Sequence, residues 1–446
     1  MIKHPQVKMF FLWILGCFFL SFSGCGGGGG ATPSAGEPAL GPISAHCLTA
    51  KGVGTSVDNT LPLYLGTAGD NSSSICGSAI NNPCTDVTIC DTSGSNCQTI
   101  SNILVDTGSS GLRVFRSVLS NTTGLDQVAA PNGDPVGECE AFGNGSYGDW
   151  GPLVYAQVRL SGEPPVTLPI QLIDPTYAGQ YTSTGSSASS TAACGQSFIP
   201  DTSPTNASFN GILGVGLFVH SCGTLCENSS GYGVFFSCSG SSCTSTTLGN
   251  CEQDQNPVPL LPTDNQGVLV SFPSPPSSNE SAATGSLILG IETQPDNTPS
   301  TSSSVVAYGT DQSGNFETTF NGTTYSSSNG GAFIDSGSDG YFFPDSAISN
   351  SGSPDYYYEP TSSQQQQSAT VAGASGSSPP STTVNFTIQT PPAQGGGFSD
   401  GVIPDIGFYV SGGFDWGLPF FFLEQNVYVG INGQTSSLGT GPFWAF

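Results

Sequence analysis

Positive charge is almost missing from this sequence of 446 residues. Six Lys and Arg stand against 32 Asp and Glu, so the formal net charge is −26. Phosphates and anionic lipid headgroups are repelled by such a surface, which disfavours nucleic-acid binding and electrostatic attachment to membranes. Charged residues total only 9%, against roughly 25% in an average globular protein. Polarity therefore depends on Ser, Thr, Asn and Gly, as is typical of β-rich extracellular proteins.

Long amphipathic helical periods are also absent. Short apolar or alternating runs bounded by Gly, Pro, Asn and Ser predict strands at residues 61–65, 99–105, 153–160, 166–173, 287–291, 331–334 and 384–388. Low-complexity segments at residues 183–192, 273–283, 295–304 and 362–383 are predicted to be surface loops. The run at residues 420–422 is too short for a membrane span and is predicted to be a core strand.

The first 24 residues have the features of a lipoprotein signal peptide. Lys3 and Lys8 form a basic start, and residues 9–20 are apolar but too few to cross a bilayer. Small residues before Cys25 resemble a bacterial lipobox, which predicts lipidation of Cys25. Ordinary secretion or an uncleaved anchor is the alternative. Residues 25–45 are predicted to be a flexible Gly/Pro-rich tether, and the protein is expected to be exported and lipid-anchored in a bacterial cell envelope.

Cysteine usage agrees with export. Twelve of the 14 cysteines remain after Cys17 and Cys25 are set aside, and all twelve precede residue 252. An even number predicts a disulfide framework in an oxidising compartment, although the sequence leaves the pairing open. No metal site is expected, because His is scarce and paired C-x-x-C spacing is missing.

One motif occurs twice, 229 residues apart. Asp106 and Asp335 each follow a short apolar run and each begin an Asp-[Thr/Ser]-Gly-Ser turn. The apolar run predicts a buried strand that ends in a carboxylate, the glycine permits a tight turn, and the hydroxyls can hydrogen-bond the acid. Two such copies predict a pair of functional carboxylates.

Six landmarks in this order resemble those of pepsin-like aspartic peptidases. They are residues 106–114, similar to the first active-site loop; 142–146, similar to the flap hairpin; 209–216; 285–291; 335–338, similar to the second loop; and 417–430. The chain resembles still more closely an uncharacterised family of bacterial lipoproteins with the motif D-T-G-S-x-G-L-R.

The resemblance implies an all-β, bilobal double β-barrel with an active-site cleft between the lobes. The N-terminal lobe would span residues 46–291, including a Cys-rich insertion at 218–255, and the C-terminal lobe residues 292–446. It implies an endopeptidase in which an Asp106–Asp335 dyad activates a water without any cofactor. Two close carboxyls share one proton, so that one acts as base and the other as acid.

The resemblance also assigns supporting roles. Residues that would support the dyad are Thr107, Gly108, Ser109, Ser336, Gly337 and Ser338, and those of the flap and substrate region are Phe142, Gly143, Tyr147 and Arg113. Phe142 stands where the family has the flap tyrosine, and Arg113 where it has that tyrosine's tryptophan partner. An Arg–aromatic contact between the two is one expectation, and a structural ion pair for Arg113 is the other.

Two functions of different classes remain open. The first is cleavage of an extended polypeptide substrate by a monomer anchored to the membrane through its lipid alone. The second is an inactive surface lipoprotein that uses the same cleft to bind a protein or a glycan. A partner-specific or self-processing protease is a third, weaker alternative. An acid optimum, lost in Asp106→Asn or Asp335→Asn, distinguishes catalysis from binding.

Overall fold

The computed structural model describes residues 58–66, 76, 79–142, 147–179, 194, 199–299, 305–352, 356–374, 379–391, 393–394, 397–398 and 401–446. The predicted signal peptide, Cys25 and the tether lie outside these residues, as does Gly143. Within the described part of the chain, no helix is both long enough and apolar enough to cross a membrane.

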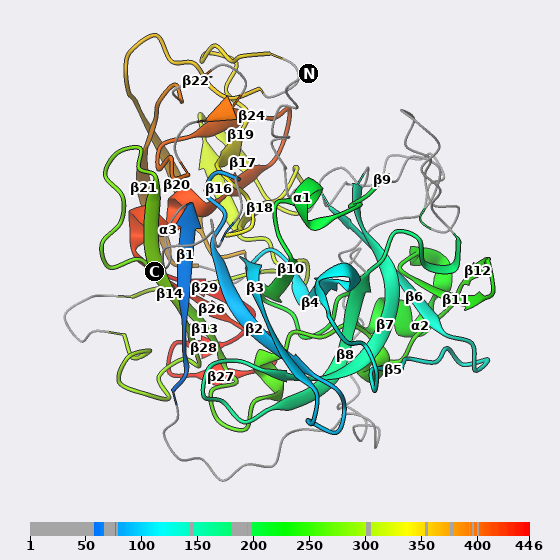
Figure 1. The fold of residues 1–446 in the computed structure, drawn as a ribbon. Coiled ribbons are helices and arrows are strands. Elements are labelled where there is room, and N and C mark those ends of the chain that lie inside the picture. The colour runs from blue at the N-terminus through cyan, green and yellow to red at the C-terminus, as the bar shows by residue number, and fades with distance from the viewer. Residues whose placement is uncertain are drawn as a thin grey trace.

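Strands dominate the structure, which confirms the all-β prediction (Figure 1). The largest sheet contains β1 (Thr60–Gly66), β2 (Cys84–Cys90), β3 (Cys97–Asp106), β4 (Ser110–Phe115), β5 (Asp126–Gln127), β6 (Val136–Phe142), β7 (Tyr147–Arg159), β8 (Val166–Ile173), β9 (Ile199–Pro200), β10 (Gly211–Val215), β11 (Phe235–Ser239), β12 (Ser242–Ser245), β13 (Gly267–Ser271), β14 (Ala282–Leu289), β15 (Ala307–Gly309), β26 (Asn426–Gly430) and β29 (Phe443–Ala445).

Smaller sheets are formed by the second half of the chain. One contains β16 (Glu317–Phe320), β17 (Thr323–Tyr325), β20 (Gln365–Ala372) and β21 (Ser381–Ile388), and another β18 (Ala332–Ile334), β19 (Tyr341–Phe343), β24 (Gly407–Tyr409) and β25 (Phe414–Trp416). Two short pairs are β22 (Ala393–Gln394) with β23 (Gly397–Phe398), and β27 (Thr435–Ser436) with β28 (Gly439–Thr440). The α-helices are short: α1 (Pro204–Ala207), α2 (Thr224–Asn228) and α3 (Leu418–Glu424).

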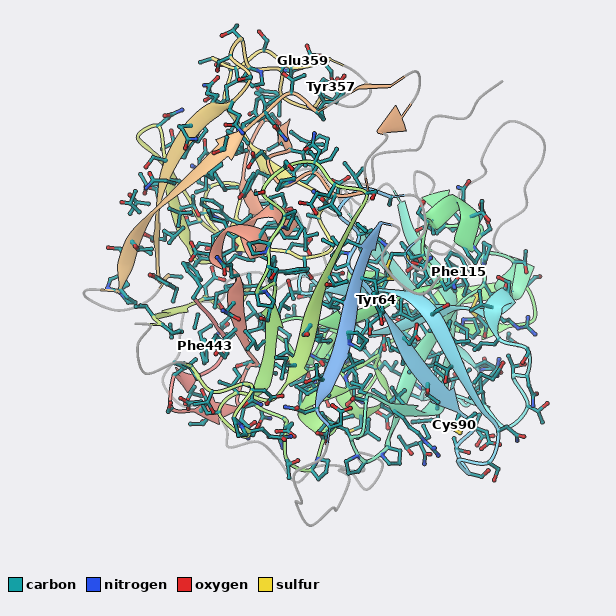
Figure 2. All side chains as sticks on the ribbon, turned by 60° about the vertical axis from the view of Figure 1, so that its left-hand side comes forward. Tyr64, Cys90, Phe115, Tyr357, Glu359 and Phe443 are labelled. Carbon is teal, nitrogen blue, oxygen red and sulfur yellow. A yellow bond between two sulfur atoms is a disulfide. The ribbon has the colours of Figure 1, made fainter. Side chains whose placement is uncertain are left out.

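The two halves are joined by one run of antiparallel strands in the order β1, β14, β13, β26, β29, β15. The C-terminal strands β26 and β29 therefore complete a sheet that the earlier strands begin. In Figure 1 this sheet lies at the lower left, below the yellow and orange strands of the second half and beside the cyan and green strands of the first half. In Figure 2, Tyr64 on β1 lies between Phe443 on β29 and Phe115 on β4.

A three-strand arrangement occurs once in each half. In the first half β10 lies between β3, to which it is parallel, and β4, to which it is antiparallel. In the second half β25 is parallel to β18 and antiparallel to β19. Each arrangement presents the loop that follows its first strand, and those two loops are the ones that carry the repeated Asp motif.

Two segments differ from their predictions. Residues 365–372 and 381–383 fall in a predicted loop but form most of the β20–β21 hairpin, whose remaining residues, 384–388, are the strand predicted for them. Its polar side chains face water while Ala369, Val371 and Phe386 are buried, so the exposed half of an alternating strand resembled a low-complexity loop. The predicted core strand at residues 420–422 lies in helix α3, which has Pro at its start and a fully apolar buried surface.

Disulfides form within the described residues, as the cysteine count predicts. They join Cys76 to Cys84, Cys90 to Cys97, Cys139 to Cys194, Cys222 to Cys226, and Cys238 to Cys243. Most close loops of fewer than ten residues, so they fasten local turns rather than distant parts of the fold.

Candidate active site

Asp106 and Asp335 are brought together by the two equivalent loops. Asp106 ends β3 and Asp335 directly follows β18, and their carboxyl groups are hydrogen-bonded to each other. Only 2% of Asp106 and 3% of Asp335 is exposed. The two acids that the sequence singles out therefore form one shielded pair, between the two halves of the molecule.

Glycine is required in both loops by close approach. The backbone N–H groups of Gly108 and Gly337 donate to Oδ1 of Asp106 and Asp335 respectively, each at 2.7 Å. A Cβ on Gly108 would lie 2.6 Å from Cγ of Asp335, and one on Gly337 would lie 2.9 Å from Cγ of Asp106. Any larger residue would therefore push the two carboxyls apart.

Hydroxyl groups hold the second oxygen of each acid. Ser109 Oγ donates to Asp106 Oδ2 at 2.6 Å, and Ser338 Oγ donates to Asp335 Oδ2 at 2.8 Å. Each carboxylate thus receives one backbone and one hydroxyl donor within its own loop. Such bonds to a charged acceptor are among the stronger hydrogen bonds in proteins, and they fix the orientation of both groups.

Thr107 and Ser336 brace the loops against each other. The N–H of Thr107 donates to Ser336 Oγ at 3.1 Å, and the N–H of Ser336 donates to Thr107 Oγ1 at 2.9 Å. Ser336 Oγ in turn donates to the carbonyl of Val105 at 2.7 Å. All of these groups are buried, so the reciprocal bonds fix the spacing of the two loops in a water-poor interior.

The surroundings favour a proton on Asp335. Burial raises the pKa of Asp335 well above its usual value, and the negative charges of Asp106 and Asp415 raise it further. Two carboxyls in contact do not both ionise at low cost, so the pair holds one proton between them over a range of pH.

Arg113 lies beside the first loop, is fully buried, and binds two carboxylates. Its Nη2 is 3.1 Å from Glu140 Oε2 and 3.4 Å from Asp254 Oδ2, and its Nη1 donates to the carbonyl of Ser110 at 3.1 Å. Burial opposes the charge of the guanidinium, but the neighbouring carboxylates outweigh this effect and raise its pKa. The structure therefore contains the ion pair expected for Arg113.

The hairpin that resembles the flap is formed by β6 and β7, with Phe142 paired to Tyr147. Phe142 is buried in an apolar cluster that includes Phe115, Phe209 and Ile212. The described structure covers the backbone of Tyr147 but not its side chain. The ring of Phe142 therefore packs the turn end of the hairpin against the apolar cluster of the first half.

The Cys-rich insertion supports this hairpin. Its strand β11 pairs with β6, and the chain then returns so that Asp254 accepts a hydrogen bond from the N–H of Leu112 at 3.1 Å. Asp254 and Glu140 are functional-site neighbours that sequence reasoning did not find. Asp254 lies in an insertion without a counterpart in the family motifs. Glu140 lies on β6, two residues before Phe142, and no local signal marks either acid.

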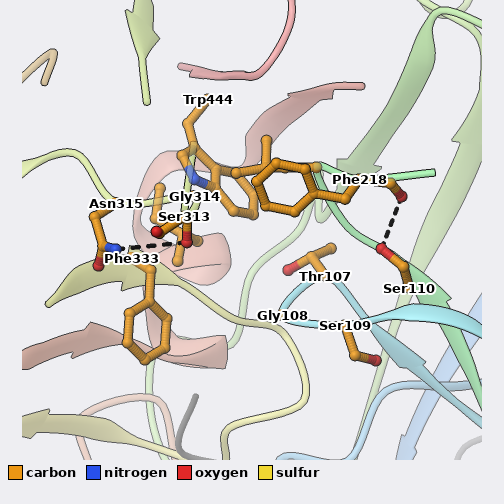
Figure 3. Close-up of a pocket in the computed structure, with 12 residues that line it drawn as sticks. Thr107, Gly108, Ser109, Ser110, Phe218, Ser313, Gly314, Asn315, Phe333 and Trp444 are labelled. Carbon is orange, nitrogen blue, oxygen red and sulfur yellow. Dashed lines mark hydrogen bonds between the residues drawn. The ribbon is translucent and has the colours of Figure 1, made fainter. Parts of the chain in front are cut away.

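A small cavity of about 40 Å³ borders the first loop (Figure 3). It is lined by Thr107, Gly108, Ser109, Ser110, Leu217, Phe218, Ser313, Gly314, Asn315, Phe333, Ile334 and Trp444. Neither Asp106 nor Asp335 is among the lining residues, so the cavity lies next to the pair and not over it. Within the described part of the chain, no group of three or more His, Cys, Asp or Glu is placed to hold a metal ion.

The fold and site define an all-β protein with a hydrogen-bonded pair of aspartic acids presented by two equivalent loops. The chain belongs to the family described as "Protein of unknown function (DUF3443)", which matches residues 55–446. No curated protein matches the chain.

Several solved structures are similar at low sequence identity. Basic 7S globulin from soybean is 12% identical with a TM-score of 0.36, over 87% of this chain and 96% of that one. Conglutin gamma from lupine seeds is 12% identical with a TM-score of 0.37, over 83% and 94%. The protein edgp is 10% identical with a TM-score of 0.35, over 88% and 96%.

Proposed function

We propose that this protein is an aspartic-type endopeptidase in which Asp106 and Asp335 activate a water molecule. The observation that carries the proposal is the hydrogen-bonded carboxyl pair itself, with matched donors on both acids. A purely structural role would not need two buried acids in contact, since burying unpaired carboxyls is costly.

In the proposed reaction Asp106 is the base and Asp335 the acid. Asp106 takes a proton from the water while the water oxygen bonds to the scissile carbonyl carbon. At the same time the proton of Asp335 moves to the carbonyl oxygen. The C–N bond then breaks as Asp106 gives its proton to the nitrogen, while a hydroxyl proton of the intermediate returns to Asp335. General acid–base steps of this kind contribute about 10²–10⁴-fold to a rate.

The substrate class proposed is an extended polypeptide. Such a chain would lie beneath the β6–β7 hairpin as an additional strand and would contribute main-chain hydrogen bonds. A second candidate is binding of a protein or glycan without hydrolysis. The low exposure of the two acids, 2% and 3%, favours this candidate, because a substrate carbonyl reaches them only after the site opens.

We also propose that the protein acts as an exported lipoprotein of the bacterial cell envelope. The disulfides support an oxidising compartment. Incorporation of labelled fatty acid into the wild type, and its loss in Cys25→Ser, tests the lipid anchor.

The deciding experiment is cleavage of denatured casein between pH 3 and 7. We expect cleavage by the wild type and by Asp345→Asn, which changes a buried acid of the second half outside the pair, and none by Asp106→Asn or Asp335→Asn. Retained cleavage in both dyad variants would contradict the proposed mechanism. Absence of cleavage by the folded wild type would support the binding candidate instead.

A further inference from the structure

A third carboxyl group lies behind Asp335 in the second half. Asp415 is in the middle of β25, fully buried, and paired in register with Phe333 of β18 and Phe342 of β19. Both of its side-chain oxygens are buried without a hydrogen-bond partner of ordinary geometry among the described residues. An acid in such a position is costly unless it is protonated or has a function.

The first half has no carboxyl at the equivalent position. Ile212 of β10 pairs with Leu104, two residues before Asp106, just as Asp415 pairs with Phe333, two residues before Asp335. Ile212 belongs to the apolar cluster around Phe142. The two halves therefore place an isoleucine behind one acid of the pair and an aspartic acid behind the other.

The neighbours of Asp415 are acidic. Burial raises its pKa well above the usual value; the Ser338 hydroxyl lowers it, and Asp339 and Asp106 raise it. Among other nearby groups, burial raises the pKa of Asp339 to about 8. Burial also raises the pKa of Glu140 on β6, and the negative charge of Asp106 adds to that rise. Burial raises the pKa of Tyr341 on β19, and the negative charges of Asp405, before β24, and Glu424, on α3, raise it further.

No positive charge of the second half can balance these acids. The sequence contains no Lys, Arg or His between residues 221 and 446. Asp415 is therefore held neutral by a proton or adds a negative charge beside Asp335. Once it is ionised, Asp415 opposes the loss of the proton from Asp335 by charge repulsion.

We propose that Asp415 is a positioning residue that keeps the shared proton of the pair on Asp335 and leaves Asp106 as the base. The inference rests on the proposed function, because it assigns the acid and base roles within the same site. Ser338 links the two groups, since its hydroxyl donates to Asp335 Oδ2 and also acts on Asp415. In the first half, Ile212 occupies the equivalent position, so no carboxyl there favours a proton on Asp106.

The test follows the carboxyl carbons of the full protein, labelled with ¹³C-aspartate, by NMR between pH 2 and 9. Asp335→Asn assigns the Asp335 signal. In Asp415→Asn, whose amide has the shape of a protonated acid, we expect Asp335 to lose its proton about 1 pH unit lower than in the wild type. The matched control Asp345→Asn leaves that titration unchanged. Asp415→Ile, which copies the first half, provides a second variant if the amide variant does not fold.

The activity profile gives the second readout. We expect the basic limb of kcat/KM against pH to move to lower pH in Asp415→Asn by the same amount, with the acid limb unchanged. An unchanged Asp335 titration in a folded Asp415 variant would overturn the inference. If no form of the protein cleaves any substrate, the proposed function fails, while the NMR titration still decides where the proton is held.

Discussion

The two halves of the molecule form the same Asp loop but surround it with different charges. The loop of Asp106 lies near Arg113, whose guanidinium faces Glu140 and Asp254. The loop of Asp335 lies near Asp415 and Asp339, and its half contains no basic residue to face them. Backbone repetition therefore produces a symmetric frame, whereas single side chains behind the frame make its two acids chemically different.

Removing the cation of the first half is expected to have the largest effect on stability. Arg113→Met leaves the buried Glu138 and Asp254 and the partly buried Glu140 without a facing positive charge, and loss of one partner of a buried ion pair costs about 3–5 kcal/mol. The free energy of unfolding in urea at pH 7 measures this loss.

Arg116 provides the matched control for that change. Its side chain is 57% exposed and pairs with Asp174 at 3.0 Å, so Arg116→Met is expected to cost less than about 1 kcal/mol. Equal losses in the two Arg variants would contradict the special role of the buried guanidinium.

Stability is expected to fall as pH rises from about 4 to 8, by a few kcal/mol at ~1.4 kcal/mol per pKa unit. Burial raises the pKa of Asp339 to about 8 and that of Glu138 to about 7, so the folded state binds protons that the unfolded state has released. Burial lowers the pKa of His220 to about 4, which acts in the opposite direction between pH 4 and 6.5.

Urea unfolding at intervals across this pH range measures the slope. Asp339→Asn is expected to reduce the fall in stability with pH, because it removes one buried carboxyl with a raised pKa. A slope of the opposite sign in the wild type would show that the buried acids are charged and paired at neutral pH.

Gly108→Ala and Gly337→Ala crowd the two loops, and each is expected to reduce activity by about 10²-fold or more. A methyl group on Gly108 or Gly337 collides with the acid of the other loop, and misplacement of reacting groups by about 1 Å costs on the order of 10² in rate. Gly412→Ala is the control, because its Cβ would meet nothing within 4 Å. Casein cleavage rates compare the three variants, and a clear difference between Gly108→Ala and Gly337→Ala would break the symmetry of the frame.

The smallest effect is expected from the loop brace. Thr107→Val leaves the N–H of Ser336 without its acceptor, and Ser336→Ala leaves the N–H of Thr107 without one, at about 1–3 kcal/mol each. Thermal unfolding measures both losses. Ser336→Ala is expected to be the more damaging of the two because Ser336 Oγ also donates to Val105.

The sequence predicted the parts of the site that are local. An apolar strand followed by Asp-[Thr/Ser]-Gly-Ser fixes the acid, its two donors and the glycine within four consecutive residues, so the pattern can be read without any long-range contact. Reciprocal hydrogen bonds between the two loops hold Asp106 and Asp335 together, as two copies of the motif suggested. Alternation of exposed and buried residues was less readable where the exposed side is Gln-rich, as in β20.

By itself, then, the sequence determined an acidic, β-rich, disulfide-bonded chain with one repeated carboxylate motif. Only the tertiary structure decided which other charges face that motif. Asp254 reaches Arg113 from 141 residues further along the chain, and Asp415 reaches Asp335 through the register of β25 on β18. These contacts depend on which strands become neighbours and in which register, and neighbouring charges in a water-poor interior set where a proton stays.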